Sequence, residues 1–290
     1  MNIFVQILFN SLETGGVQAL ATLGVILIFR TSSAFNYAQG VISMFCAFMA
    51  AHFLHTTGMN VWISTLVGLL GAICVGVIID RVVIGRAVKL HSVSKQIITL
   101  GLIMVFLGLA PMFFGIVPLS YTRFAMGAVG LFGANLPYGA IVNILISLVV
   151  MMAMFYVIQR TKWGLAIRAT ASNDVMARLM GIPTPLVTMA SWAIAAAMGT
   201  LAALMIAPDT TVNLNMMNSI QITALLACVL GGLGTFHGPV IAAYLIVFTR
   251  QITTFYISSV WSEAIVYTMI LGVLMINPNG MFGKKAVKKV

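Results

Sequence analysis

Long apolar runs recur along the whole chain and are separated by short polar or glycine-rich interruptions. A helix needs roughly 20 mostly apolar residues to cross a bilayer, whereas a membrane β-barrel shows alternating segments of about ten residues. The pattern therefore predicts an all-α, polytopic helical membrane protein of about eight spans. The runs expected to form them are 15–29, 41–54, 61–84, 97–115, 138–158, 186–207, 220–249 and 257–276. Asn2 to Glu13 alternates at helical spacing and predicts a separate, short interfacial helix.

The longest polar interruption is Arg160 to Pro183, which carries four basic residues and one acid. Between Trp163 and Met180 it predicts one amphipathic helix, whose apolar residues fall four apart and which ends where Gly181 supplies a cap. The expected apolar row is Trp163, Ile167, Ala171, Val175 and Leu179. A basic amphipathic helix between two spans either lies on anionic lipid headgroups or docks into another protein, and the composition suits both.

Basic residues in the loops predict the topology, because cytoplasmic loops carry an excess of lysine and arginine. The loop between the third and fourth spans holds four bases and is placed in the cytoplasm: Arg81, Arg86, Lys89 and Lys95. Alternation then puts 116–137 and 208–219 outside, 160–183 and the loop after Arg30 inside, and the N-terminus outside.

The C-terminal third fits this topology only with one further break. The lysines of the tail, at 284, 285, 288 and 289, require a cytoplasmic C-terminus. The tail reaches the cytoplasm if 220–249 crosses the membrane as two shorter passes rather than one. The break would lie at Gly231, Gly232 and Gly234, with Arg250 outside. Glycine-rich breaks occur at membrane depth where they are buried in protein or line a cavity.

Two stretches join apolar half-helices through a polar, glycine-bearing turn: 19–40 and 230–239. A broken helix exposes unpaired backbone groups that can bind a polar solute, although glycines also simply allow close helix packing. The glycines alone favour packing, whereas the polar side chains of Asn36, Gln39 and His237 need a partner or water at that depth, which shifts the balance toward binding. The candidate residues of a translocation path are Asn36, Gln39, Gly40, Gly231, Gly232, Gly234 and His237.

Composition excludes several function classes. Charged residues make up 7% of the 290 positions and the mean hydropathy is +1.09, which indicates one membrane domain over residues 1–290. The net charge of +10 resides in loops and the tail and does not indicate nucleic-acid binding. Catalytic, nucleotide-binding and metal-ligand spacings are absent from the sequence, so we expect no enzyme activity, no metal and no cofactor in this chain. Five acids also leave little for proton or sodium coupling.

Two smaller features carry expectations of their own. The three cysteines, Cys46, Cys74 and Cys228, are isolated within apolar runs and are expected to be buried thiols. Asp80 precedes Arg81 in sequence, which suggests a local ion pair at the cytoplasmic boundary.

Four stretches resemble a known family: ALATLGVILIFRTSSAFNYAQG, TKWGLAIRATASNDVMARLMGI, LGGLGTFHGPVIAAYL and NPNGMFG. They are similar to motifs of the permease subunits of bacterial ABC importers for branched-chain amino acids, in particular the smaller of the two paired permeases. Relatives in that family include urea and short-amide permeases. Asn277 stands where the family commonly has an arginine.

The resemblance implies a role and a set of partners. The loop 160–183 would dock into a cytoplasmic ATPase, which uses ATP and Mg²⁺, through Trp163, Ile167, Arg168, Ala171, Asp174, Val175, Arg178 and Gly181. Two such ATPases, a second homologous permease, a periplasmic binding protein and membrane lipid would be the partners, in the bacterial inner membrane. The alternatives are a urea or short-amide permease of the same family, and a passive channel or secondary carrier in which the basic helix rests on lipid.

Overall fold

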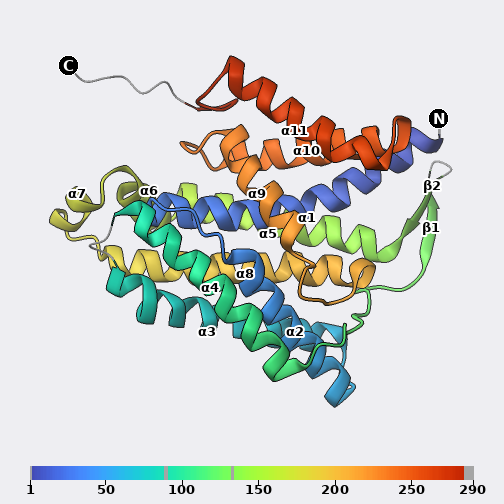
Figure 1. The fold of residues 1–290 in the computed structure, drawn as a ribbon, viewed down its shortest axis with the longest axis horizontal. Helices are drawn as coiled ribbons and strands as arrows, with labels where there is room; N and C mark the ends of the chain where they lie inside the picture. Colours follow the sequence, from blue (N-terminus) through green and yellow to red (C-terminus); the bar gives the residue numbers. More distant parts are fainter. Residues whose placement is uncertain (1, 88–90, 132–133, 284–290) are drawn as a thin grey trace.

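The computed structural model describes residues 2–87, 91–131 and 134–283, and within these ranges the chain folds into eleven α-helices (Figure 1). The helices are α1 (Asn2–Ser32), α2 (Gln39–Thr57), α3 (Val61–Ile79), α4 (Ser92–Phe114), α5 (Tyr138–Arg160), α6 (Lys162–Ser172), α7 (Asp174–Leu179), α8 (Thr184–Thr210), α9 (Asn218–Gly231), α10 (His237–Tyr256) and α11 (Ser259–Ile276). Seven of them are long and apolar enough to cross a membrane. The predicted all-α polytopic membrane fold is confirmed; Lys89 and the tail lysines lie outside the described residues.

Short elements complete the chain. A π-helical turn, η1 (Asp80–Ile84), and a 3-10 turn, η2 (Gly85–Ala87), extend α3. An antiparallel hairpin of β1 (Ala128–Leu131) and β2 (Ala134–Pro137) stands in the predicted outer loop, with Ala128 opposite Pro137.

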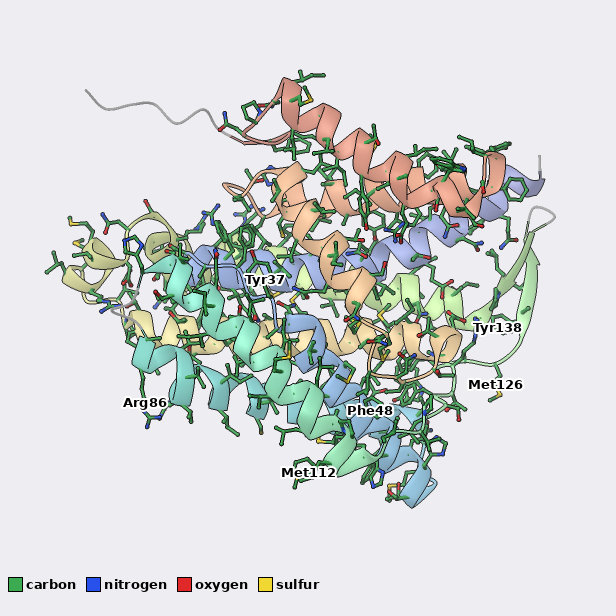
Figure 2. The ribbon with its side chains drawn as sticks, in the orientation of Figure 1. Tyr37, Phe48, Arg86, Met112, Met126 and Tyr138 are labelled. Atoms are coloured by element: carbon green, nitrogen blue, oxygen red, sulfur yellow. The ribbon has the colours of Figure 1, made fainter. Side chains whose placement is uncertain are left out.

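Helices α1 and α8 form the centre of the bundle, because most of their surface is buried while α4, α5 and α11 are mostly exposed. Leu20, Leu23 and Leu204 are among the fully buried side chains of this core. Small residues let the central helices approach closely: a Cβ on Gly76 of α3 would lie 2.7 Å from the Trp192 carbonyl oxygen of α8. Many large apolar side chains face outward, as Met112 illustrates, and suit contact with lipid (Figure 2).

One helix begins inside the bundle, and another is too short to cross a bilayer. After α1 the chain turns back through residues 33–38, and α2 starts at Gln39 in the interior (Figure 1). Helix α9 has only 14 residues, or about 21 Å, less than the roughly 30 Å of a bilayer core. The predicted break of 220–249 is confirmed, since α9 ends at Gly231 and α10 begins at His237.

The predicted separate helix over Asn2 to Glu13 is wrong, because α1 runs without interruption for 31 residues. Gly15 and Gly16 do not break it, since other helices pack directly on them. A Cβ on Gly15 would lie 2.4 Å from Cδ1 of Tyr244, and one on Gly16 would lie 2.3 Å from Oγ of Ser147. The glycines therefore permit close packing of α1 against α10 and α5.

Arg250 was predicted in an outer loop, and the structure places it inside α10 instead. No proline or glycine follows it to end the helix before Tyr256. Its guanidinium Nη2 donates to Oγ1 of Thr223 on α9 at 3.1 Å, and Thr223 is fully buried. Arg250 thus joins α10 to α9.

The prediction of three buried thiols holds for two of them. Cys46 and Cys228 are buried, whereas Cys74 is exposed on α3. An apolar run does not specify which face of its helix points inward, and α3 presents most of its surface outward.

The two ends of the bundle differ in their elements. Helices α6 and α7, the α9–α10 turn and the end of α11 lie at one end, while the N-terminus and the β-hairpin lie at the other (Figure 1).

Candidate functional site

The segment between α5 and α8 forms two helices, so the single helix predicted over Trp163 to Met180 is wrong. Asn173 adopts an extended conformation between them, with φ −161° and ψ 107°, and its side-chain oxygen accepts from the Met176 N–H at 3.0 Å. This is an N-cap for α7, as Thr161 is for α6. An asparagine that can bond to the backbone in this way favours a new helix start over a continuous helix.

The predicted apolar row does not form one face. Ile167 is 3% exposed and packs into the core of the chain itself, and Ala171 is half-buried, whereas Trp163 is 49% exposed and Val175 is 66% exposed. The break at Asn173 explains the mismatch, because it changes the direction of the second helix. The exposed apolar residues that gather at α7 are Val175, Met176, Leu179 and Met180. We call this set the α7 apolar cluster.

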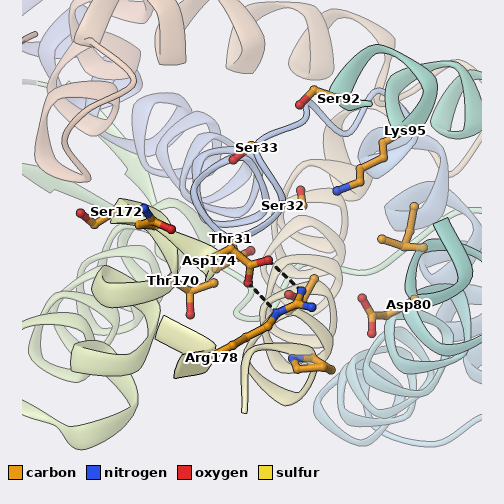
Figure 3. Close-up of a pocket in the computed structure, with 16 residues that line it drawn as sticks. Thr31, Ser32, Ser33, Asp80, Ser92, Lys95, Thr170, Ser172, Asp174 and Arg178 are labelled. Atoms are coloured by element: carbon orange, nitrogen blue, oxygen red, sulfur yellow. Dashed lines mark hydrogen bonds and ion pairs between the residues drawn. The ribbon is translucent and has the colours of Figure 1, made fainter. Parts of the chain in front are cut away.

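Charged and backbone contacts fix α7 to α8. Arg178 pairs with Asp174 one turn earlier at 2.7 Å (Figure 3). The Nε of Arg178 also donates to Oγ1 of Thr184 at 2.8 Å. Gly181 has φ +80°, the left-handed conformation that the sequence predicted, and the Ile182 N–H donates to the Ala177 carbonyl. Arg168 is exposed.

Asp80 and Arg81 do not form the predicted ion pair. Arg81 points away, with Nε 3.4 Å from Sδ of Met189, while Asp80 is 6% exposed. Adjacent residues on a helix do not face each other, which explains why the pair does not form.

Asn36, Gln39 and Gly40 lie together in the interior where α2 begins. The Asn36 carbonyl accepts from Nε2 of Gln221 on α9 at 3.0 Å, and a Cβ on Gly40 would lie 3.0 Å from Cβ of Gln221. Nε2 of Gln39 donates to the Ala195 carbonyl at 3.3 Å, while its Oε1 is buried without a partner.

A cavity of about 280 Å³ borders Gly40 and Gln221. Sequence analysis missed Gln221, although an amide within the apolar run of α9 was a usable signal.

The other candidates, Gly231, Gly232, Gly234 and His237, lie at the α6–α7 end of the bundle, at the α9–α10 turn (Figure 1). The segment after α11 packs against them. The Met281 N–H donates to the Leu230 carbonyl at 2.7 Å, and the Phe282 N–H donates to the Gly231 carbonyl at 3.3 Å.

Further contacts hold this turn. Arg30 donates to the Gly234 carbonyl and lies over the Phe236 ring, 5.0 Å from its centroid. The rings of His237 and Phe282 make an edge-to-face contact at 5.9 Å. The seven path candidates therefore form two groups: one in the interior, the other in a packed turn.

Comparison with known proteins assigns the chain to a family. The family described as "Branched-chain amino acid transport system / permease component" matches residues 7–276. The chain belongs to this permease family. The match spans the interior site and both polar turns.

Individual relatives agree with this assignment. The high-affinity branched-chain amino acid transport system permease protein LivH of Escherichia coli is 24% identical over 99% of this chain and 98% of its own length. BraD of Pseudomonas aeruginosa, named as the corresponding permease, is 25% identical over the same shares. A probable branched-chain amino acid transport permease of Methanocaldococcus jannaschii is 23% identical over 96% and 92%.

One solved structure shares the fold. The PsaBC complex of Streptococcus pneumoniae with Fab has a chain that aligns with a TM-score of 0.54 at 13% identity. The alignment covers 95% of this chain and 94% of that chain, so the shared fold extends over almost the whole of both.

Proposed function

We propose that this chain is the membrane-spanning permease subunit of an ATP-driven importer for branched-chain or other hydrophobic amino acids. Membership of the permease family, with relatives named for branched-chain amino acid transport, carries the proposal. Residues 1–290 form one transmembrane domain of the bacterial inner membrane. The N-terminus faces outward and the α6–α7 end faces the cytoplasm.

The α6–α7 segment is the docking element for the ATPase. The α7 apolar cluster supplies anchors of the kind that dominate protein interfaces, and Arg168 and Trp163 are also exposed on the same segment. Gly181 and the Arg178–Thr184 hydrogen bond connect α7 rigidly to α8, a central helix, so movement of the segment is transmitted into the bundle. ATP and Mg²⁺ are used by the partner subunit, and this permease performs no catalysis.

The importer contains further subunits in this proposal. A second homologous permease completes the pathway, two ATPases supply energy, and a periplasmic binding protein delivers the amino acid. Asn36, Gln39 and Gly40, together with Gln221, line the path in this proposal: Gly40 and Gln221 border the cavity, and the Oε1 of Gln39 is a buried, unpaired polar group nearby. The packed contacts of Gly231, Gly232, Gly234 and His237 favour a structural role at the turn.

Replacing one residue of the α7 apolar cluster tests the docking. Leu179 is 75% exposed, so Leu179→Asp should leave the fold intact and place an unpaired charge in the interface. Loss of a central anchor typically weakens an interface by about 2 kcal/mol or more, or roughly 30-fold. The ATPase should therefore no longer co-purify, and amino-acid uptake by proteoliposomes should fall to background.

Val93 provides the matched control, since it is 61% exposed at the start of α4 and lies outside the α6–α7 segment. Val93→Asp should retain the ATPase. Wild-type permease that purifies without an ATPase and transports amino acids without ATP would instead identify a passive channel or secondary carrier.

A further inference from the structure

A cavity of about 450 Å³ lies between the α6–α7 segment, the end of α1, the η1 turn and the start of α4 (Figure 3). Small-molecule sites have volumes of about 300–1,000 Å³, so the space suits a small ligand. Its walls come from elements far apart in sequence, including both the proposed coupling segment and the transmembrane bundle. It is separate from the interior site at Gly40 and Gln221.

Two opposite charges in this cavity have no ion-pair partner among the residues that the structure describes. Asp174 and Arg178 neutralise each other, but in the described part of the chain neither Asp80 nor Lys95 has an ion pair within 4 Å. Asp80 is 6% exposed, and its Oδ1 is buried without a hydrogen-bond partner. A buried charge without a partner costs free energy, so its retention points to a ligand that supplies one.

Asp80 lines the cavity at a distortion of its helix. Asp80 starts the π-helical turn η1, a distortion that occurs frequently at functional sites. The Gly85 N–H closes this turn by donating to the Asp80 carbonyl, five residues earlier. Figure 3 shows the carboxylate of Asp80 and the side chain of Lys95 extending toward the space between them.

A second polar group at the wall is also unpaired. Thr170 of α6 is 5% exposed, and its hydroxyl is buried without a partner. Besides the Asp174–Arg178 ion pair, the walls offer a second anion, a second cation and an unpaired hydroxyl, next to the apolar side chains of Ile84, Ala171 and Pro185.

We propose that this cavity binds the zwitterion of an α-amino acid. Lys95 binds the α-carboxylate, Asp80 binds the α-ammonium group, Thr170 adds a hydrogen bond, and the aliphatic side chain lies against Ile84 and Pro185. A simple anion would satisfy Lys95 but be repelled by Asp80, and a simple cation would have the reverse problem. That the amino acid has an aliphatic side chain rests on the proposed function. That the ligand is a zwitterion rests on the charges of Asp80 and Lys95.

The position of the site gives binding a consequence. One wall is the coupling segment and the opposite wall is the bundle, so a bound amino acid bridges them and favours one arrangement of the two. Imported amino acid that accumulates on the ATPase side would therefore slow further uptake. The same chemistry also suits an amino acid that is leaving the translocation path. Supplying the amino acid from one side of the membrane at a time distinguishes this case from rebinding of imported amino acid.

Equilibrium binding of tritiated leucine to the complete detergent-solubilised complex, without binding protein, tests the site. Leucinamide lacks the carboxylate and N-acetylleucine lacks the ammonium group, so each should compete about 30-fold or more weakly than leucine. Lys95→Gln and Asp80→Asn should each weaken leucine binding to the same extent. Lys162→Gln is the control, because Lys162 is exposed at the start of α6 and does not line the cavity.

Proteoliposomes distinguish the source of the ligand. Leucine added only to the ATPase side should inhibit uptake by the wild type and not by Lys95→Gln, which indicates a feedback site. Inhibition absent in both, with binding intact, indicates a site on the exit route. Both results retain the amino-acid site.

The inference is overturned if the wild-type complex transports leucine but binds none without the binding protein. Binding unchanged by Lys95→Gln and Asp80→Asn, or equal competition by both analogues, overturns it as well. In each of these cases uptake continues and the proposed function stands. Absence of ATP-driven uptake in the wild type would contradict the proposed function itself. The competition by leucinamide and N-acetylleucine uses only wild-type protein, so it tests the zwitterion site even if Asp80→Asn does not fold.

Discussion

At the scale of single residues, glycines determine how the C-terminal segment meets the α9–α10 turn. Gly232 has φ +94° and Gly280 has φ +81°, conformations that L side chains rarely adopt. A Cβ on Gly232 would lie 2.7 Å from the Gly283 nitrogen. The turn therefore needs glycine at position 232 for both its backbone and its contacts.

Gly232→Ala should destabilise the permease by about 1–3 kcal/mol, since it forces a non-glycine residue into a strained conformation and a close contact. Gly234→Ala is the matched control: it lies in the same turn, has no positive φ, and a Cβ there meets nothing within 4 Å. Thermal unfolding of the two variants in detergent measures the difference. Equal midpoints would contradict the proposed packing role of this turn.

At the scale of an element, the α6–α7 segment contains both apolar residues that pack into the bundle and apolar residues that are exposed. Ile167 belongs to the internal core, while Val175 is exposed. In one continuous helix these residues, eight positions apart, would lie on the same face. The helix break at Asn173 separates the two functions: α6 attaches the segment to the bundle and α7 presents it outward.

Ile167→Ala should cost about 2–4 kcal/mol of stability, because it removes buried side-chain volume. Val175→Ala should change stability by less than about 0.5 kcal/mol and instead weaken coupling between ATP hydrolysis and uptake. Unfolding midpoints and the ratio of hydrolysed ATP to imported amino acid, measured on the same preparations, separate the effects. A stable Ile167→Ala protein would show that α6 is not anchored as described.

At the scale of the whole molecule, polar features are distributed between two ends and an interior. The α6–α7 segment, the charged cavity and the α9–α10 turn share one end, while the β-hairpin and the Arg123–Asp209 ion pair belong to the other (Figures 1 and 3). This distribution accords with the proposed orientation, with coupling on the cytoplasmic side and binding-protein contact on the outer side.

Cysteine labelling in intact cells tests the orientation in a background with Cys46→Ala, Cys74→Ala and Cys228→Ala. Met126→Cys and Ile257→Cys should react with a membrane-impermeant maleimide, since both side chains are exposed at the outer end. Met180→Cys should react only after permeabilisation. Arg250→Cys should react poorly from either side, because Arg250 lies within α10 against α9. Labelling of Met180→Cys in intact cells would reverse the orientation.

The sequence by itself determined the fold class, most span positions, the break at the glycine run and the left-handed Gly181. These depend on local physics: apolar length, the conformational freedom of glycine and the end signals of helices. The family resemblance also rested on residues visible in the sequence, and the match over residues 7–276 agrees with it.

Only the tertiary structure decided which face of each helix is buried and which distant residues meet. Cys74 points outward, Ile167 points inward, and Arg250 stays in its helix beside Thr223, because neighbouring helices determine each environment. The cavity joining Asp80, Lys95 and Thr170 arises from three separate elements. Hydropathy reports that a segment prefers the membrane, but in a bundle surrounded by lipid both faces of a helix can be apolar, so the inward face is selected by packing.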